Sequence, residues 1–209
     1  MRPETMSPSK WHTRQGAGLA CVFFLSGAAA LVYQICWQRV LFGAFGIDIE
    51  SVTIIVSTFM LGLGIGAIAG GMLADRYPQR MLPLFAASEA GIGLFGLFSM
   101  GLIRAAGEYF VDSPAVLIFV INFLLLLVPT SMMGATLPML VVHTVRQGNA
   151  VGVSVGGLYF ANTLGAAFGS YLIGFVWLLY YTLQSAVVAA AVINLALAAV
   201  VAATAWRLK

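Results

Sequence analysis

Charged side chains are scarce in this chain of 209 residues, of which Asp, Glu, Lys and Arg make up only 8%. Soluble domains typically contain about a quarter of such residues. The scarcity therefore excludes a water-soluble globular protein. The excess of basic residues, a net charge of +3, lies at the ends of apolar runs, so it indicates membrane topology rather than nucleic-acid binding.

Cysteine and histidine are also rare, with two residues of each. Cys21 and Cys36 lie in one apolar run, too far apart along a helix for a disulfide bond. His12 and His143 are isolated, and no spacing typical of a metal site is present. Motifs of zinc proteases, nucleophile elbows and phosphate-binding loops are missing as well. We therefore expect no metal, no cofactor and no enzyme activity in this chain.

Apolar residues are abundant, at 61% of the chain, and the mean hydropathy is +1.00. A helix needs about 20 residues to cross the hydrocarbon core of a bilayer. Six runs are long enough, and the first continues too far for a secretory signal. The sequence predicts an all-α integral membrane protein with a transmembrane domain over 17–206, flanked by cytoplasmic segments 1–16 and 207–209. The predicted spans are 17–37, 51–74, 81–103, 115–142, 151–177 and 183–205.

The basic residues predict the orientation of these six helices. With both termini in the cytoplasm, only Arg39 and Arg104 lie on the outer side. The cytoplasmic side then holds Arg2, Lys10, Arg14, Arg76, Arg80, Arg146, Arg207 and Lys209. This distribution follows the positive-inside rule. Asp48 and Glu50 fall on the outer side near Arg39, where we expect an exposed ion cluster.

Glycines four residues apart mark the second and fifth runs, where they allow another helix to approach closely. These glycines are Gly62, Gly66 and Gly70, then Gly165 and Gly169. We expect the two runs to be the central packing elements. They occupy equivalent places in a three-plus-three division of the chain, which is compatible with the inverted repeat of secondary transporters.

Several segments resemble known transporter families. Residues 71–76, followed by Arg80, are similar to the loop between the second and third helices of major facilitator superfamily (MFS) transporters. Residues 26–39 resemble the opening of the membrane part of bacterial fused MFS/spermidine synthase proteins. Gln34, a further candidate for the substrate or proton path, stands where that family usually has Glu. Residues 129–138, residues 158–166 and Glu89 resemble the same family.

This resemblance implies a half-MFS-like six-helix bundle in the bacterial inner membrane. It also implies that Asp75, Arg76 and Arg80 form a charge latch at the cytoplasmic face; a polar turn with basic anchors is the simpler interpretation. The synthase half of the fused proteins has no counterpart in this sequence, so aminopropyl transfer is not expected.

Glu89 is the one carboxyl group predicted well inside a span. An ionisable group there is costly, faces the bundle interior, and typically marks a proton or ligand path. Burial without a nearby cation favours its neutral form. The alternative is a neutral carboxylic acid that ties two helices together by a hydrogen bond.

Other polar residues of the spans are candidates for a substrate cavity. Asn162 and Thr163 could line it together with Tyr159 and Tyr33, or they could hydrogen-bond between helices. In the fourth run, Pro129 and Pro138 predict either a locally unwound stretch over 132–136 or a kink. A haem or chlorophyll at His143 is the weaker interpretation, because no partner histidine accompanies it.

Two functions are compatible with these residues. The first is a transporter-like module for a small solute, polyamine-related by resemblance alone, that acts as a homodimer. The second is a non-transporting subunit or scaffold that docks onto a larger membrane complex or a separate synthase-like protein.

Overall fold

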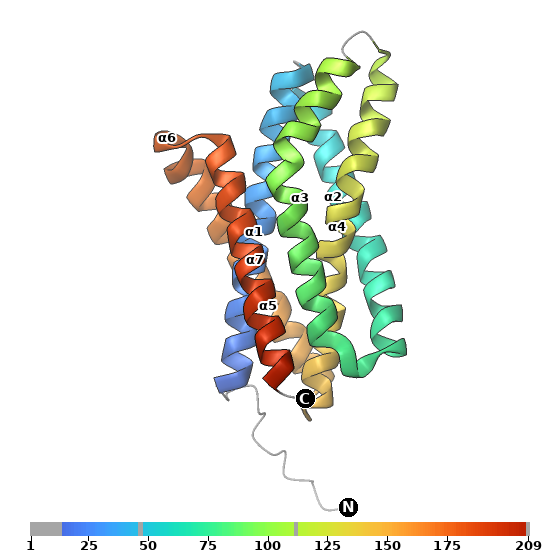
Figure 1. Ribbon diagram of the computed structural model, residues 1–209, viewed down its shortest axis with the longest axis vertical. Coiled ribbons are helices and arrows are strands. Elements are labelled where there is room, and N and C mark those ends of the chain that lie inside the picture. The colour runs from blue at the N-terminus through green and yellow to red at the C-terminus, as the bar shows by residue number, and fades with distance from the viewer. Residues whose placement is uncertain (1–13, 46–47, 111–112, 208–209) are drawn as a thin grey trace, which may run out of the picture.

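The protein is a bundle of six long helices. The computed structural model describes residues 14–45, 48–110 and 113–207, and no strand occurs in these ranges (Figure 1). The helices are α1 (Arg14–Phe45), α2 (Asp48–Arg76), α3 (Met81–Tyr109), α4 (Ala115–Arg146), α5 (Val151–Tyr171) and α7 (Leu183–Arg207). Short elements are η2 (Pro78–Arg80), η3 (Leu172–Trp177) and α6 (Leu178–Tyr180). The predicted all-α six-helix fold is confirmed.

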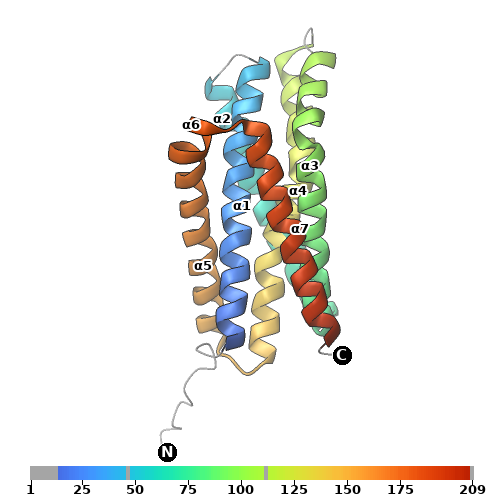
Figure 2. The same cartoon turned by 60° about the vertical axis from the view of Figure 1, so that its left-hand side comes forward.

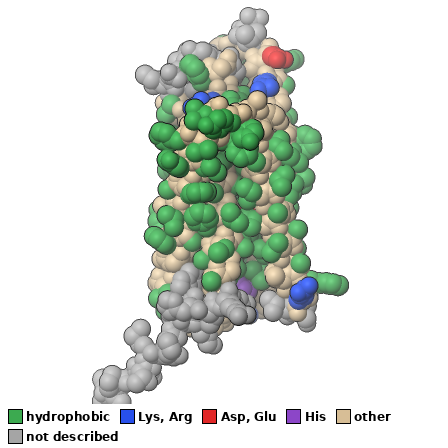
Figure 3. All heavy atoms as spheres, turned by 90° about the vertical axis from the view of Figure 1, so that its left-hand side faces the viewer, with side chains coloured by type: hydrophobic (Ala, Val, Ile, Leu, Met, Phe, Trp, Pro, Cys, Tyr) green, Lys and Arg blue, Asp and Glu red, His purple; other side chains and the backbone are tan. Residues whose placement is uncertain are grey.

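Six helical segments are long and apolar enough to cross a membrane. Hydrophobic side chains cover the full height of the face seen in Figure 3, and charged side chains lie near its two ends. The helices extend further than predicted: α1 reaches Phe45 and α3 reaches Tyr109. Arg39 and Arg104 therefore lie on helices near their ends, where long basic side chains can reach the membrane surface. The chain is a multi-pass membrane protein.

Both ends of the described chain lie at the same end of the bundle. The start of α1 and the end of α7 meet there, together with the turns after α2 and α4 (Figures 1 and 2). We call this the termini end, and the other the opposite end. Arg76 and Arg146 thus lie at one end, as the six-span topology requires. That this end faces the cytoplasm stays a prediction.

The glycine-rich helices α2 and α5 are not central, contrary to the sequence-based expectation. In α3, 50% of the most apolar stretch is buried inside the bundle. The buried share of the corresponding stretch is only 33% in α2 and 17% in α5. Figure 2 shows α5 at the edge of the bundle, beside α1. Each glycine row admits one close neighbour, whereas the remaining faces carry bulky exposed side chains such as Ile68 and Phe160. The two helices are therefore the outer partners of α4 and α1.

These two close contacts have the same register. Gly66 and Gly70 of α2 lie against the backbones of Ser131 and Ala135 of α4. In the other pair, Gly165 and Gly169 of α5 lie against the backbones of Phe24 and Ala28 of α1. Both pairs advance by four residues on each helix. The glycine just before each alanine, Gly134 or Gly27, in turn meets Leu63 of α2 or Asn162 of α5.

The remaining packing follows the same division. Helix α3 packs against α4, α7 packs against α1, and α3 and α7 pack against each other. If α1, α2 and α3 exchange places with α4, α5 and α7, respectively, the same pairs of packed helices result. Because three is odd, the second set runs in the opposite direction through the membrane. The contacts fit the predicted three-plus-three inverted repeat.

The prediction of an unwound stretch in the fourth helix is wrong, because α4 is one continuous α-helix through Pro129 and Pro138. Hydroxyl groups close to each proline donate to backbone carbonyls of the same helix: Thr130 to Leu126, and Thr136 to Met133. The departure from α-helical geometry lies instead in α5, which continues as the π-helix η3.

Candidate functional site

Glu89 is fully buried on α3 and is bonded to two other helices. Ser26 of α1 donates its hydroxyl hydrogen to Glu89 Oε1 at 2.6 Å. Asn194 of α7 donates from Nδ2 to Glu89 Oε2, also at 2.6 Å. We call Ser26, Glu89 and Asn194 the triad. It ties three helices together through one carboxyl group.

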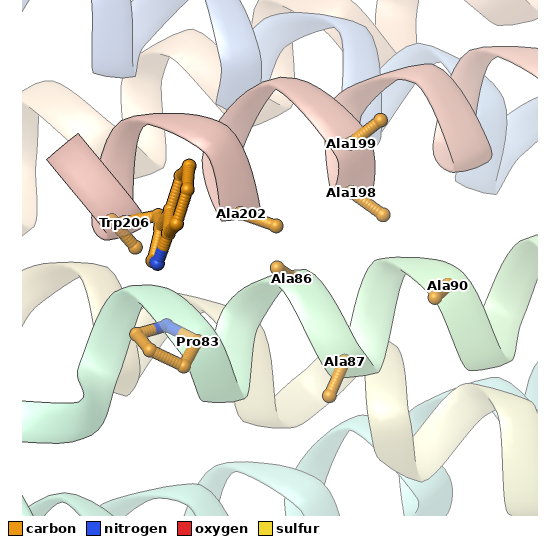
Figure 4. A pocket seen from close by; sticks show the side chains of 9 residues that line it. Pro83, Ala86, Ala87, Ala90, Ala198, Ala199, Ala202 and Trp206 are labelled. Carbon is orange, nitrogen blue, oxygen red and sulfur yellow. The ribbon is translucent and has the colours of Figure 1, made fainter.

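Small residues bring α7 close enough to reach Glu89. One turn beyond Glu89, a Cβ atom at Gly93 would lie 3.0 Å from the carbonyl oxygen of Ala191 and 3.2 Å from Asn194 Cβ. Nearer the termini end, alanines of both helices face one another across a groove of about 520 Å³ (Figure 4). The labelled alanines include Ala86 and Ala90 on α3 and Ala198 and Ala202 on α7.

Two polar atoms near the triad have no hydrogen-bond partner among the described residues. They are Asn194 Oδ1 and the hydroxyl oxygen of the fully buried Tyr33. Tyr33 lies against Gly96, two turns beyond Glu89 on α3. An unsatisfied buried polar atom costs about 1–3 kcal/mol. These two atoms therefore leave hydrogen-bonding capacity unused in the part of the bundle that holds the carboxyl group.

The asparagine suits both protonation states of the carboxyl group. As assigned, its Nδ2 donates to a carboxylate oxygen. Because the oxygen and nitrogen of an amide exchange places on a half-turn of the side chain, Oδ1 can equally accept a hydrogen bond from a protonated Glu89. Ser26 can donate to the carbonyl oxygen of either form. Protonation therefore requires one amide rotation rather than a rearrangement of helices.

Between the triad and the opposite end, a cluster of aromatic side chains fills the interior of the bundle. Tyr33 stacks on Trp37 with ring centroids 5.1 Å apart, and Phe95 meets Trp37 edge to face at 5.7 Å. Phe59 of α2 also contacts Trp37. Trp37 Nε1 donates to Ser99 Oγ at 2.9 Å, so the indole N–H is satisfied.

The other path candidates do not join Tyr33 and Glu89. Tyr159 is 60% exposed on α5, and Thr163 is also exposed. Asn162 is half-buried and lies against Gly27 of α1, which gives it a packing contact. Gln34 is half-buried and takes no part in the triad. A cavity shared by Tyr33 and Tyr159 is therefore not formed in this structure.

The residues of the predicted charge latch lie at the termini end. Asp75, Arg76 and Arg80 are all exposed, and no ion pair joins them. The Arg76 guanidinium lies over the ring of its neighbour Tyr77, 5.6 Å from the ring centroid. The turn η2 begins at Pro78. The latch itself stays a prediction.

The cysteines and His143 do not gather at one site. Cys21 is exposed and Cys36 is buried. His143 Nε2 lies 2.9 Å from Gln147 Nε2 at the end of α4. Among the described residues, no three His, Cys, Asp or Glu side chains form a group that could hold a metal ion. The side chains of Asp48 and Glu50 lie outside the described part of the structure, so the ion cluster with Arg39 stays a prediction.

The chain was compared with protein-family models, curated proteins and solved structures. None of them matched. The likeness to the fused MFS/spermidine synthase proteins thus rests on the segments quoted above.

Sequence reasoning did not identify Ser26 and Asn194 as functional residues. A signal was present for each. Ser26 begins the segment that carries the family resemblance, and Asn194 is the one amide side chain in the apolar interior of the last span. Polar residues inside a span usually face a helix partner.

Proposed function

We propose that this protein is a membrane transport module in which Glu89 takes up and releases a proton as a small solute moves. The compatibility of the triad with both protonation states carries the proposal. Asn194 donates to Glu89 as assigned, and after a half-turn of its amide the unpartnered Oδ1 can accept from a neutral Glu89. A purely structural carboxyl group would need only one of these arrangements.

The position of Glu89 supports the same function. It lies a little over two turns from the start of α3, within the stretch that is apolar enough to cross a membrane. No cation of the described chain pairs with it. A charged carboxylate in such a place is costly, so the neutral form predominates until a conformational change or a ligand favours release.

The charge of the side chains around Glu89 narrows the class of solute. No Lys or Arg belongs to the triad or to its aromatic neighbours, so a small neutral or cationic solute is the better partner for a carboxyl group. The resemblance to fused MFS/spermidine synthase proteins adds polyamines to this class. We propose that the inner membrane of a bacterium is the site of action, with the termini end in the cytoplasm.

Reconstitution tests this function. Proteoliposomes containing the purified chain and a trapped pH-sensitive dye would be given a panel of polyamines, amino acids and sugars under an imposed pH gradient. We expect one class of solute to accelerate proton movement beyond that in protein-free liposomes. If no solute class changes the proton flux, Glu89 does not couple transport in this chain.

A scaffold that docks onto another membrane protein is the second candidate function, and one observation favours it. Only 17% of the most apolar stretch of α5 is buried inside the bundle. A Cβ atom would meet open space at Gly152 and Gly156 of α5 and at Gly174 of η3. We expect extraction in a mild detergent to yield a homodimer if the chain is a transport module. A stoichiometric complex with another protein, without solute-linked proton flux, would favour the scaffold function instead.

A further inference from the structure

A second cavity lies at the termini end between α1, α3, α4 and α7, separate from the triad. Its volume is about 430 Å³. Most of its wall is apolar, and its polar side chains are His143, Thr204 and Arg207. Thr204 and Arg207 are exposed, so the cavity reaches the surface of the bundle.

This cavity lies nearer the termini end than the triad does. Three of the four helices around it are those that carry the triad. Each triad residue has a cavity-lining residue seven positions nearer the termini end on the same helix: Leu19 for Ser26, Leu82 for Glu89 and Val201 for Asn194. Seven residues are two helical turns, or about 10 Å. Because seven residues are nearly two whole turns, Leu19, Leu82 and Val201 lie on about the same helix faces as the triad residues.

Two phenylalanines occupy the level between them. Phe23 lies between Leu19 and Ser26 on α1, and Phe85 lies between Leu82 and Glu89 on α3. Both are buried and meet edge to face, with ring centroids 6.5 Å apart. On α7 the same level holds Leu197 and the small Ala198. One layer of aromatic rings therefore separates Glu89 from the cavity.

The direction toward the opposite end is closed by a thicker layer. Seven residues beyond the triad lie Tyr33, Gly96 and the fully buried Val187. Trp37, Phe59 and Phe95 continue the packing above them. Fewer packed layers therefore separate Glu89 from the termini end than from the opposite end.

We propose that the cavity is the entrance through which water and protons reach Glu89 from the termini end, and that Phe23 and Phe85 are the barrier that must move. Once the two rings have moved, water from the cavity reaches Glu89, and a hydronium ion there transfers its proton to the Glu89 carboxylate and becomes water. The inference rests on the proposed function, since it assigns the side from which the same carboxyl group exchanges its proton.

Chemical modification from one side of the membrane tests the entrance. A membrane-impermeant carbodiimide would be added to membrane vesicles of either orientation, and the peptide carrying Glu89 would be analysed by mass spectrometry. We expect Phe85→Ala to raise the modification rate at least about tenfold from the termini side, which corresponds to lowering the opening barrier by about 1.4 kcal/mol. Phe59→Ala, which also truncates a buried phenylalanine, should not raise that rate.

A variant at the mouth of the cavity keeps the test valid if Phe85→Ala does not fold. Thr204→Cys in a Cys21→Ser background would be labelled with a bulky maleimide. We expect this label to reduce the modification of Glu89 from the termini side several-fold. Faster modification from the opposite side, or rates unaffected by both Phe85→Ala and the label, would overturn the proposed entrance.

The access test and the transport test have separate readouts. If no solute moves protons but Phe85→Ala exposes Glu89 from the termini side, the entrance stands and the transport function fails. If solute-linked proton flux occurs but neither variant changes the modification rate, the transport function stands and the entrance is wrong.

Discussion

Replacing Glu89 by glutamine is expected to abolish solute-linked proton flux in proteoliposomes while the bundle remains folded. Glutamine has nearly the same shape and keeps both contacts, since its oxygen can accept from Ser26 and its amide can donate to Asn194 Oδ1. It cannot gain or lose a proton. A positioned acid or base typically contributes at least a hundredfold to a rate, so we expect a loss of about a hundredfold or more.

Glu108→Gln is the matched control for this substitution. Glu108 also lies on α3, but it is exposed at the opposite end. The control should retain the flux of the wild-type chain. Equal flux in Glu89→Gln and wild type, with both proteins folded by circular dichroism, would mean that the triad is only a link between helices.

The second large effect is expected at the glycines of the two close helix pairs. An added Cβ at Gly66 would overlap the carbonyl oxygen of Ser131, and one at Gly165 would overlap that of Phe24. Backbone atoms cannot rotate away, so the helices must separate. We expect Gly66→Ala and Gly165→Ala each to lower the free energy of unfolding by about 1–3 kcal/mol. Unfolding in a denaturing detergent would measure the change.

Two neighbouring glycines provide controls on the same helices. Gly64 of α2 and Gly156 of α5 have open space where a Cβ would lie. Alanine there should leave stability unchanged or raise it by up to about 1 kcal/mol, because alanine favours the helix. Similar stabilities for Gly66→Ala and Gly64→Ala would contradict the close packing of α2 on α4.

The sequence predicts the helices well because their signal is local. Each apolar run is long enough to identify a span by itself. The predicted ends were too short, because Arg39 and Arg104 do not stop a helix at the membrane surface. The helix ends coincide instead with turn residues such as Pro78, Pro114 and Gly148, which has a φ of 90°.

The site was predicted only in part because its contacts are distant in the sequence. Glu89 stands out as a carboxyl group in an apolar run. Its partners lie 63 and 105 positions away, so no local pattern pairs them with it. Thr163 and Tyr159 illustrate the converse. Apolar residues are distributed around all sides of the fifth span, so its sequence does not indicate which face meets the bundle.

Infrared difference spectroscopy of wild type against Glu89→Gln in membranes tests the central claim most directly. The account predicts a C=O stretching band of a protonated carboxyl group in the wild type that is replaced by carboxylate bands as the pH is raised and that is missing from the variant. It also predicts that Ser26→Ala shifts this band, because one hydrogen bond to the carboxyl group is removed. Carboxylate bands alone at Glu89 across the whole range from acid to neutral pH would contradict the account.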